Sequence, residues 1–313
     1  MSQTLNFGSL FGAPEHMDAG VAVIAPLHSP ANMAVLRNQD LHDDGFVHGP
    51  IVSRHRRLAD GSFEELTPAK RTEDRRIRLR ATHTMEWKDS GAAALDRHIP
   101  MVLLHLLAAC YDVRLQFADW WEFEPAKARA SLEFIARPDE LAQMLRSAMA
   151  AVQRLNSEQI ARMAAILNLH GRILGMSSIW QQFAWQYSVV DGCWKQMKDL
   201  GIIEQGTSDT TPHSKRLAVL DKKIGGHTDA ARLKAICQRR NNLIHECLEE
   251  GGPADMGRAR EIAFDYNDLR RLSLRLLLHS LNVECGFVQT PWAIQVSLGT
   301  PLLKLANWEC TSQ

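Results

Sequence analysis

The stretch LRRLSLRLLLHSL, residues 269–281, is rich in leucine and closes a longer segment, 256–281, in which apolar residues recur at helical spacing. The same period runs through most of the chain before it, from about residue 91 onward. Proline and glycine fall mostly between these segments, as they do at helix boundaries. The sequence therefore predicts an all-α region over residues 91–285. Its other expected helices are 92–121, 138–155, 157–174, 177–200, 214–224 and 228–248.

Several of these boundaries carry helix-end residues. Asn156 precedes Ser157 and Glu158 at one expected start, and Thr228 with Asp229 opens another. The glycines and proline of residues 251–253 follow the segment 228–248, as is typical of a helix end. Pro100 lies inside the first segment, so that helix is expected to be kinked or to start near it.

Residues 1–90 follow a different pattern. They are rich in Gly, Pro and His, and short apolar runs such as GVAVIAP, residues 20–26, lie between turn formers. Asp60-Gly61 between two extended runs predicts a hairpin. The fold class expected is α+β, mainly α: a β-rich N-terminal domain over 1–90, a helical domain over 91–285 and a tail over 286–313. The tail could add a strand, pack across the helices or dock on a partner, and the sequence does not decide among these.

The overall charge indicates no class of partner, because 36 Lys and Arg balance 36 Asp and Glu. Any contact with nucleic acid must come from a local patch. Between residues 54 and 80 there are nine basic and five acidic side chains, and a strand expected over 75–82 would place three arginines on one face. That face could contact an RNA backbone, or it could protect an edge strand against aggregation. The three residues are Arg76, Arg78 and Arg80.

Other features exclude several classes of protein. The six cysteines form no Cys-x-x-Cys pair, and His42, His48 and His55 fit no standard zinc spacing, so we expect no metal and reduced thiols. The N-terminus lacks the pattern of a signal peptide, and the longest apolar run, 99–110, is too short to span a membrane. We therefore expect a cytoplasmic protein without a membrane partner. The chain also lacks the glycine-rich loops of P-loop NTPases and Rossmann oxidoreductases.

The strongest functional signal is RRNNLIHE, residues 239–246, late in the segment 228–248. An imidazole beside a guanidinium suits RNA cleavage without a metal: His245 can move a proton while Arg240 neutralises charge on the phosphate. Asn241 could orient the guanidinium or bind the phosphate. Five residues correspond to about 140° of net rotation on a regular helix, so Arg240 and His245 should diverge. Loosening of the helix end, or a second copy of the helix, would bring them together. A solvated helix end is the alternative interpretation.

The pattern Arg240-Asn241-x-x-x-His245 resembles the Arg-(Asn/Asp/His)-x-x-x-His motif of the HEPN superfamily, named for higher eukaryotes and prokaryotes nucleotide-binding. The resemblance covers residues 130–285. An aromatic-rich helix precedes the motif, and a leucine-rich helix follows it. The aromatic residues by themselves suggest a core or dimer interface more than a base-stacking platform. They are Trp180, Phe183, Trp185, Tyr187 and Trp194.

This resemblance implies a helical bundle and a metal-independent endoribonuclease without a cofactor. It also implies a homodimer in which Arg240 and His245 of both chains line one RNA-cleaving cleft. Family members include toxins of toxin–antitoxin pairs, antiviral effectors and CRISPR-associated nucleases, so an antitoxin or a defence complex would be a further partner. Asp191 is the expected acidic residue on an earlier helix. The alternative is a non-catalytic module that binds a nucleotide, RNA or protein partner, as some relatives do.

Overall fold

A computed structural model gives the fold, and the chain divides into two compact units. The first, here called the sheet unit, comprises Met1–Ala93 and Val113–Ser131; the second, the helical unit, comprises Ala94–Asp112 and Leu132–Gln313. Residues 113–131 were expected in the helical domain but join the sheet unit, because a strand there pairs with the first strand of the chain. The described residues are 4–8, 10–11, 16–40, 46–47, 54–66, 79–88, 98–118, 126–127, 138–204, 211–226, 228–245, 256–283, 285 and 288.

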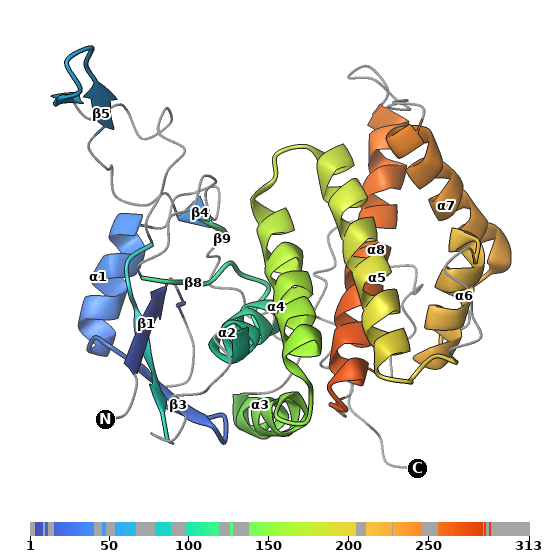
Figure 1. The fold of residues 1–313 in the computed structure, drawn as a ribbon, viewed down its shortest axis with the longest axis horizontal. Helices are drawn as coiled ribbons and strands as arrows, with labels where there is room; N and C mark the ends of the chain where they lie inside the picture. Colours follow the sequence, from blue (N-terminus) through green and yellow to red (C-terminus); the bar gives the residue numbers. More distant parts are fainter. Residues whose placement is uncertain are drawn as a thin grey trace. The chain divides into compact units, whose positions relative to one another are not determined.

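The sheet unit contains an antiparallel sheet in the order β2-β3-β7-β1-β8, of which Figure 1 labels β1, β3 and β8. Its central strand, β7, alternates buried His83, Met85 and Trp87 with more exposed Thr84 and Glu86, as a sheet with one packed face requires. The β-rich character expected of the N-terminal region is therefore observed among the described residues. The strands are β1 (Thr4–Gly8), β2 (Met17–Asp18), β3 (Ala22–Pro26), β7 (His83–Trp87) and β8 (Gln116–Phe117).

Two smaller strand pairs lie in the same unit. The hairpin expected at Asp60-Gly61 is confirmed: β5 (Arg54–Arg57) pairs with β6 (Phe63–Leu66) across this turn. Asp60 accepts a hydrogen bond from the backbone of Ser62 at 2.9 Å, and Gly61 takes the positive φ of 84° that favours glycine. The other pair joins β4 (Phe46–Val47) to β9 (Ala126–Lys127).

Two local features of the sheet unit differ from the sequence prediction. The helix α1 (Pro30–Asp40) was not expected; its Met33 and Leu36 pack against a small buried cluster made of Phe11, Val47, Leu79 and Ala126. Residues 79–82 were expected in a strand but are not in one, and β7 begins only at His83. The preceding segment bonds instead to the ends of other strands, since the backbone N–H of Thr82 donates to the carbonyl of Phe7. Residues 75–78 lie outside the described residues.

The helical unit confirms the helices expected from periodicity. One differs: the first helix is shorter, because the chain turns at Asp112, which has a positive φ of 49°, and then enters β8. Pro100 lies in its first turn, where the missing N–H breaks no helix bond. The helices are α2 (His98–Cys110), α3 (Pro138–Val152), α4 (Ser157–Arg172), α5 (Ile179–Asp199), α6 (His213–Lys223), α7 (Ala230–His245) and α8 (Met256–Ser280). None of the helices that the structure describes is both long and apolar enough to cross a membrane.

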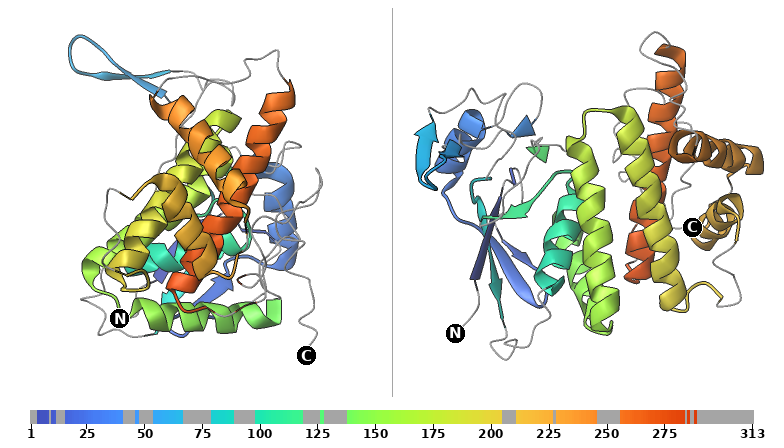
Figure 2. Two further views of the ribbon diagram at one scale, coloured as in Figure 1. Left: turned by 90° about the vertical axis from the view of Figure 1, so that its right-hand side faces the viewer. Right: turned by 45° about the horizontal axis from the view of Figure 1, so that its top comes forward.

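The leucine-rich helix α8 lies beside α5, as Figure 1 and the right-hand view of Figure 2 show. Both helices are largely buried where they face the bundle, with Leu269, Leu272 and Leu276 of α8 fully enclosed. On one side, α4 packs between α5 and α2; on the other, α7 contacts both α5 and α6. The helix that carries RRNNLIHE therefore lies on the face of α5 away from α4.

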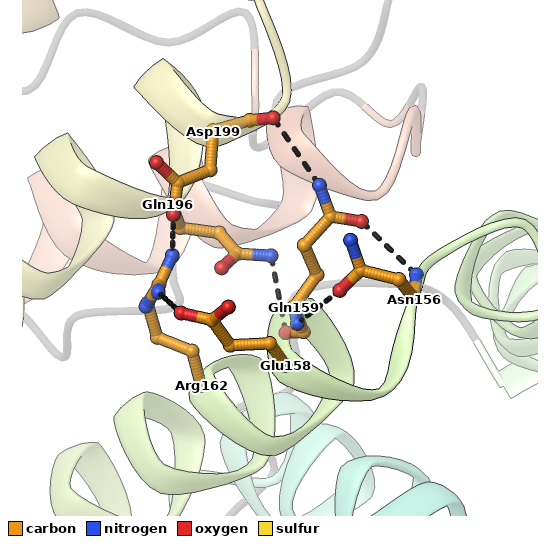
Figure 3. Close-up of polar contacts among 6 residues, drawn as sticks. All are labelled: Asn156, Glu158, Gln159, Arg162, Gln196 and Asp199. Carbon is orange, nitrogen blue, oxygen red and sulfur yellow. Dashed lines mark hydrogen bonds and ion pairs between the residues drawn. The ribbon is translucent and has the colours of Figure 1, made fainter.

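A polar seam joins the start of α4 to the end of α5 (Figure 3). Asn156 and Gln159 form a capping box, each side chain accepting from the backbone N–H of the other. The Gln159 amide also donates to the carbonyl of Asp199 at 3.2 Å, and Gln196 donates to the carbonyl of Gln159 at 3.2 Å. Arg162 pairs with the carboxylate of Asp199 at the surface. These contacts fix the register of α4 against α5.

A second polar contact lies inside the bundle. Arg270 of α8 donates from Nε and Nη2 to Oδ1 of Asp112, at 3.1 and 2.5 Å, and from Nη1 to the carbonyl of His170 at 2.9 Å. Only 3% of the Arg270 side chain and 9% of the Asp112 side chain are exposed. Burial lowers the pKa of the neighbouring His170 imidazole well below its usual value, so this imidazole is neutral. The buried ion pair thus ties α8 to the ends of α2 and α4.

Replacing Arg270 should therefore destabilise the helical unit strongly. Arg270→Met removes this charged partner from the buried Asp112 carboxylate, which costs about 3–5 kcal/mol of unfolding free energy. Arg162→Met is the matched control, because its ion pair lies at the surface and is worth about 1 kcal/mol or less. Urea unfolding followed by circular dichroism measures both. Equal losses in the two variants would contradict the importance of the buried pair.

Candidate functional site

The motif residues lie along the face of α7 that packs against the bundle and at the end of this helix. Leu233, Ile236 and Cys237 form the buried stripe, at the three- and four-residue spacing of one helix face. Arg240 continues this stripe one turn after Cys237 and is half-buried. His245 is the last residue of α7 and is exposed. The motif therefore begins at the edge of the core and ends in solvent.

Arg240 and His245 meet within one chain. Nη1 of Arg240 lies 2.8 Å from Nε2 of His245 and 3.1 Å from Oδ1 of Asn241, to which it donates. Because a guanidinium only donates hydrogen bonds, Nε2 is the acceptor and the imidazole is in its neutral form in this arrangement. The divergence expected from helix geometry is overcome without a partner chain. The long arginine side chain reaches the final residue of the helix, where the imidazole is free to turn toward it.

Tyr187 of α5 forms the floor beneath Arg240. The Cζ atom of Arg240 lies 5.6 Å from the centre of the Tyr187 ring, a cation–π contact. The ring is almost fully buried, and its hydroxyl lies 3.3 Å from Sγ of Cys237, one turn before Arg240 on α7. Burial raises the pKa of the Tyr187 hydroxyl, which therefore stays protonated. The expectation that this aromatic residue belongs to the core holds, and the same ring also positions Arg240.

Asp191 lies one turn beyond Tyr187 on α5 and borders the same place. Its Oδ1 atom is 3.3 Å from Nδ1 of His213 and 3.7 Å from Nη1 of Arg216. Burial raises the pKa of the Asp191 carboxyl, while His213, Arg216 and Arg240 act in the opposite direction. The structure thus brings this predicted acidic residue within electrostatic reach of Arg240.

Two residues of α6, His213 and Arg216, were not foreseen as part of the site. The His213 ring lies 5.6 Å from the Tyr187 ring, centre to centre, at an angle of 59°. Arg216 lies over the Trp194 ring, 5.9 Å from its centre. No local spacing links either residue to the motif more than twenty positions later. The only sequence signal for these two residues is their position: a histidine and an arginine lie in the first turn of the helix before the motif helix.

The turn between α6 and α7 brings His213 and Arg216 of α6 close to the motif helix. The Asp221 carboxylate accepts hydrogen bonds from the backbone and hydroxyl of Thr228, at 2.8 and 3.0 Å. Gly226 packs so closely that a Cβ there would lie 1.9 Å from Oδ1 of Asp221. Only glycine therefore fits at this position, and the compact turn brings α6 back alongside α7.

Arg239, next to Arg240 in the sequence, has a different role. Its Nε donates to the Asp265 carboxylate of α8 at 2.7 Å, and Arg232 pairs with the other oxygen of the same carboxylate at 2.5 Å. Asp265 is fully buried. Asn242 instead accepts a hydrogen bond from Gln238, one turn earlier on α7. Arg239 therefore holds α7 to α8 and does not belong to the candidate site.

Of the three arginines predicted to bind RNA, the structure describes only Arg80. Arg76 and Arg78 lie outside the described residues. Arg80 is exposed in the sheet unit, and its Nη1 donates to Oε1 of Gln39 at 3.4 Å. Among the residues that the structure describes, no group of three or more His, Cys, Asp or Glu side chains could hold a metal ion.

No family model, curated protein or solved structure matches this chain. The function is therefore argued from the residues and geometry of the site.

The neighbouring arginines Arg239 and Arg240 should differ in their effect on stability. Arg239→Ala removes one of the two counterions of the buried Asp265 carboxylate, so we expect a loss of about 1–3 kcal/mol in unfolding free energy. Arg240→Ala removes contacts near the surface and should cost less than about 1 kcal/mol. Chemical denaturation of the two single variants measures the difference. A larger loss for Arg240→Ala would show that this residue is structural.

Proposed function

We propose that this protein is a metal-independent endoribonuclease of the HEPN type, in which Arg240 holds the scissile phosphate and His245 transfers a proton. The observation that carries the proposal is the 2.8 Å contact between Arg240 Nη1 and His245 Nε2. A guanidinium and an imidazole so close can act on one phosphodiester. The motif at the end of α7, the aromatic α5 beneath it and the leucine-rich α8 after it add support through their chain order.

Arg240 is well placed to receive an anion. Its Nε atom is buried without a hydrogen-bond partner, and Nη1 is shared between Asn241 and His245. A phosphate oxygen would compete for the Nη1 donor through a charge-assisted hydrogen bond, which is stronger than one to a neutral group. Binding would draw the guanidinium from Nε2 of His245. The imidazole would then be free to exchange a proton with the RNA.

The competing function is a non-catalytic module that binds a nucleotide or RNA through Arg240. The observation that favours it is the same contact, because Arg240 occupies the nitrogen of His245 that catalysis would use. The two functions differ in whether bound RNA is cut.

Incubation of the purified protein with single-stranded RNA and a chelator tests the proposal. We expect cleavage that leaves 2′,3′-cyclic phosphate ends, because the 2′-hydroxyl is the nucleophile when a histidine supplies the base. Arg240→Ala and His245→Ala should each lower the rate by about 100-fold or more, since each removes a charge or proton-transfer contribution of that size. Lys234→Ala removes an exposed positive charge from the same helix and should cleave normally. RNA that is retarded in a gel but intact would support the binding module, and normal cleavage by both site variants would overturn the proposed roles.

We also infer that the protein is a homodimer that pairs through α7, and that it acts as a toxin or antiviral effector, restrained by an antitoxin or a defence complex. The sheet unit would position RNA or sense a trigger. Ile244, next to His245, is a large apolar residue that is 43% exposed, so it is the side chain on which we place the contact with a second copy of α7.

The dimer can be tested by light scattering of the purified protein. We expect the mass of two chains, and Ile244→Asp should shift the protein toward the monomer because it places a charge in the apolar contact. Ala235→Asp, an exposed position nine residues earlier on α7, is the control for added charge alone. A monomer at micromolar wild-type concentration would contradict this part of the proposal.

A further inference from the structure

Cleavage of RNA by its own 2′-hydroxyl requires two proton transfers. The bond from the 2′-oxygen to phosphorus forms while the bond from phosphorus to the 5′-oxygen breaks. The 2′-hydroxyl loses a proton and the departing 5′-oxygen gains one. Because the attacking and leaving oxygens lie on opposite sides of the phosphorus, one imidazole can serve only one of them directly. A second group is needed beside the Arg240–His245 pair.

The structure places a second imidazole in the same cluster. His213 and Arg240 both lie against the Tyr187 ring, although they come from different helices. The carboxylate of Asp191, one turn from Tyr187, lies 3.3 Å from Nδ1 of His213, and Arg240 acts on this carboxylate electrostatically. His245 contacts Arg240 directly, with Nε2 at 2.8 Å from Nη1. One guanidinium is thus associated with two histidines from two helices.

We propose that His213, positioned by Asp191, is the base that removes the 2′-hydroxyl proton, and that His245 is the acid that protonates the departing 5′-oxygen. This assignment rests on the endoribonuclease function proposed above. The proton taken by His213 and the proton given by His245 are exchanged with water afterwards. The products are a 2′,3′-cyclic phosphate and a 5′-hydroxyl, and no further reactant is consumed.

The surroundings of His213 suit a base. Its Nδ1 is buried and lies 3.3 Å from Oδ1 of Asp191 without hydrogen-bond geometry, and the negative charge of this carboxylate favours the tautomer with the proton on Nδ1, which leaves the lone pair on Nε2. The side chain is 27% exposed, so a substrate can reach it. The charged and titratable neighbours are Asp191 and Tyr187 of α5, Arg216 of α6 and Arg240 of α7. Burial and the two arginines lower the pKa of His213, with Asp191 opposing them, so the free imidazole stays unprotonated at neutral pH.

His245 has the opposite surroundings. It is exposed at the C-terminal end of α7, where the helix dipole favours a positive charge. Once a phosphate draws Arg240 from Nε2, this nitrogen can take a proton from solvent and donate it to the departing oxygen. The two histidines are therefore suited to different steps, because His213 is partly buried beside the Asp191 carboxylate and His245 is exposed at the end of its helix.

The test uses an RNA oligonucleotide containing a linkage that the wild-type protein cuts, made once with the ordinary 5′-oxygen and once with a bridging 5′-sulfur. A thiolate leaves without being protonated, so sulfur removes the need for the acid and not for the base. We expect His245→Ala to be slow on the oxygen substrate and accelerated at least tenfold by sulfur, relative to wild type. His213→Ala should be slow on both. Lys215→Ala, an exposed position on the same helix, should match wild type on both.

A second variant separates chemistry from a purely structural role. His213→Asn keeps an N–H that can contact Asp191, but it cannot accept a proton at neutral pH. It should remain as slow as His213→Ala while melting at the wild-type temperature. Normal cleavage by His213→Ala or His213→Asn would overturn the inference and leave the proposed function standing. Sulfur rescue of His213→Ala in place of His245→Ala would overturn the assignment of base and acid. A wild-type protein that cuts no RNA would instead overturn the proposed function itself.

Discussion

The buried carboxylate of Asp265 is the constraint on which the candidate site depends. It is fully enclosed on α8 and is held by Arg232 and Arg239 of α7. These arginines are seven residues apart, two helical turns, and so lie on one face of their helix. Engaging both fixes the rotation of α7 about its own axis. Arg240 follows Arg239 by about 100° of rotation, which directs it onto the Tyr187 ring of α5.

The titratable groups around Tyr187 are partly or fully buried, and burial disfavours their charged forms. Burial raises the pKa values of the Asp191 carboxyl and the Cys237 thiol, and it lowers that of the His213 imidazole. Arg240 and Arg216 lower both pKa values, so they partly offset the effect of burial on the Asp191 carboxyl and add to its effect on the His213 imidazole. These opposite shifts have one cause, because burial disfavours the charged forms of acids and bases alike. The partial exposure of His213 and His245 distinguishes this cluster from the enclosed Arg270–Asp112 pair, which no substrate can reach.

Periodicity alone predicted the helical unit because its helices are long and bury continuous apolar stripes, as α8 does with its leucines. It missed α1, whose Met33 and Leu36 are only partly buried and pack against residues distant in the sequence. It also extended the first helix past Asp112, where the chain leaves for the sheet. At the site, the motif residues could be found because they are local. His213 could not, since its place beside Arg240 depends on the tight turn that Asp221 and Gly226 make.

The contact between Arg240 and His245 has a consequence for how the site would work. In the free protein Arg240 donates to a neutral imidazole, and such a hydrogen bond contributes only about 1 kcal/mol. A phosphate oxygen carries charge, and charge-assisted hydrogen bonds are roughly twice as strong. The contact also lies at the exposed end of α7, where little packing opposes movement of either side chain. The anion that the site is proposed to bind would therefore separate the pair and leave Nε2 of His245 open to the RNA.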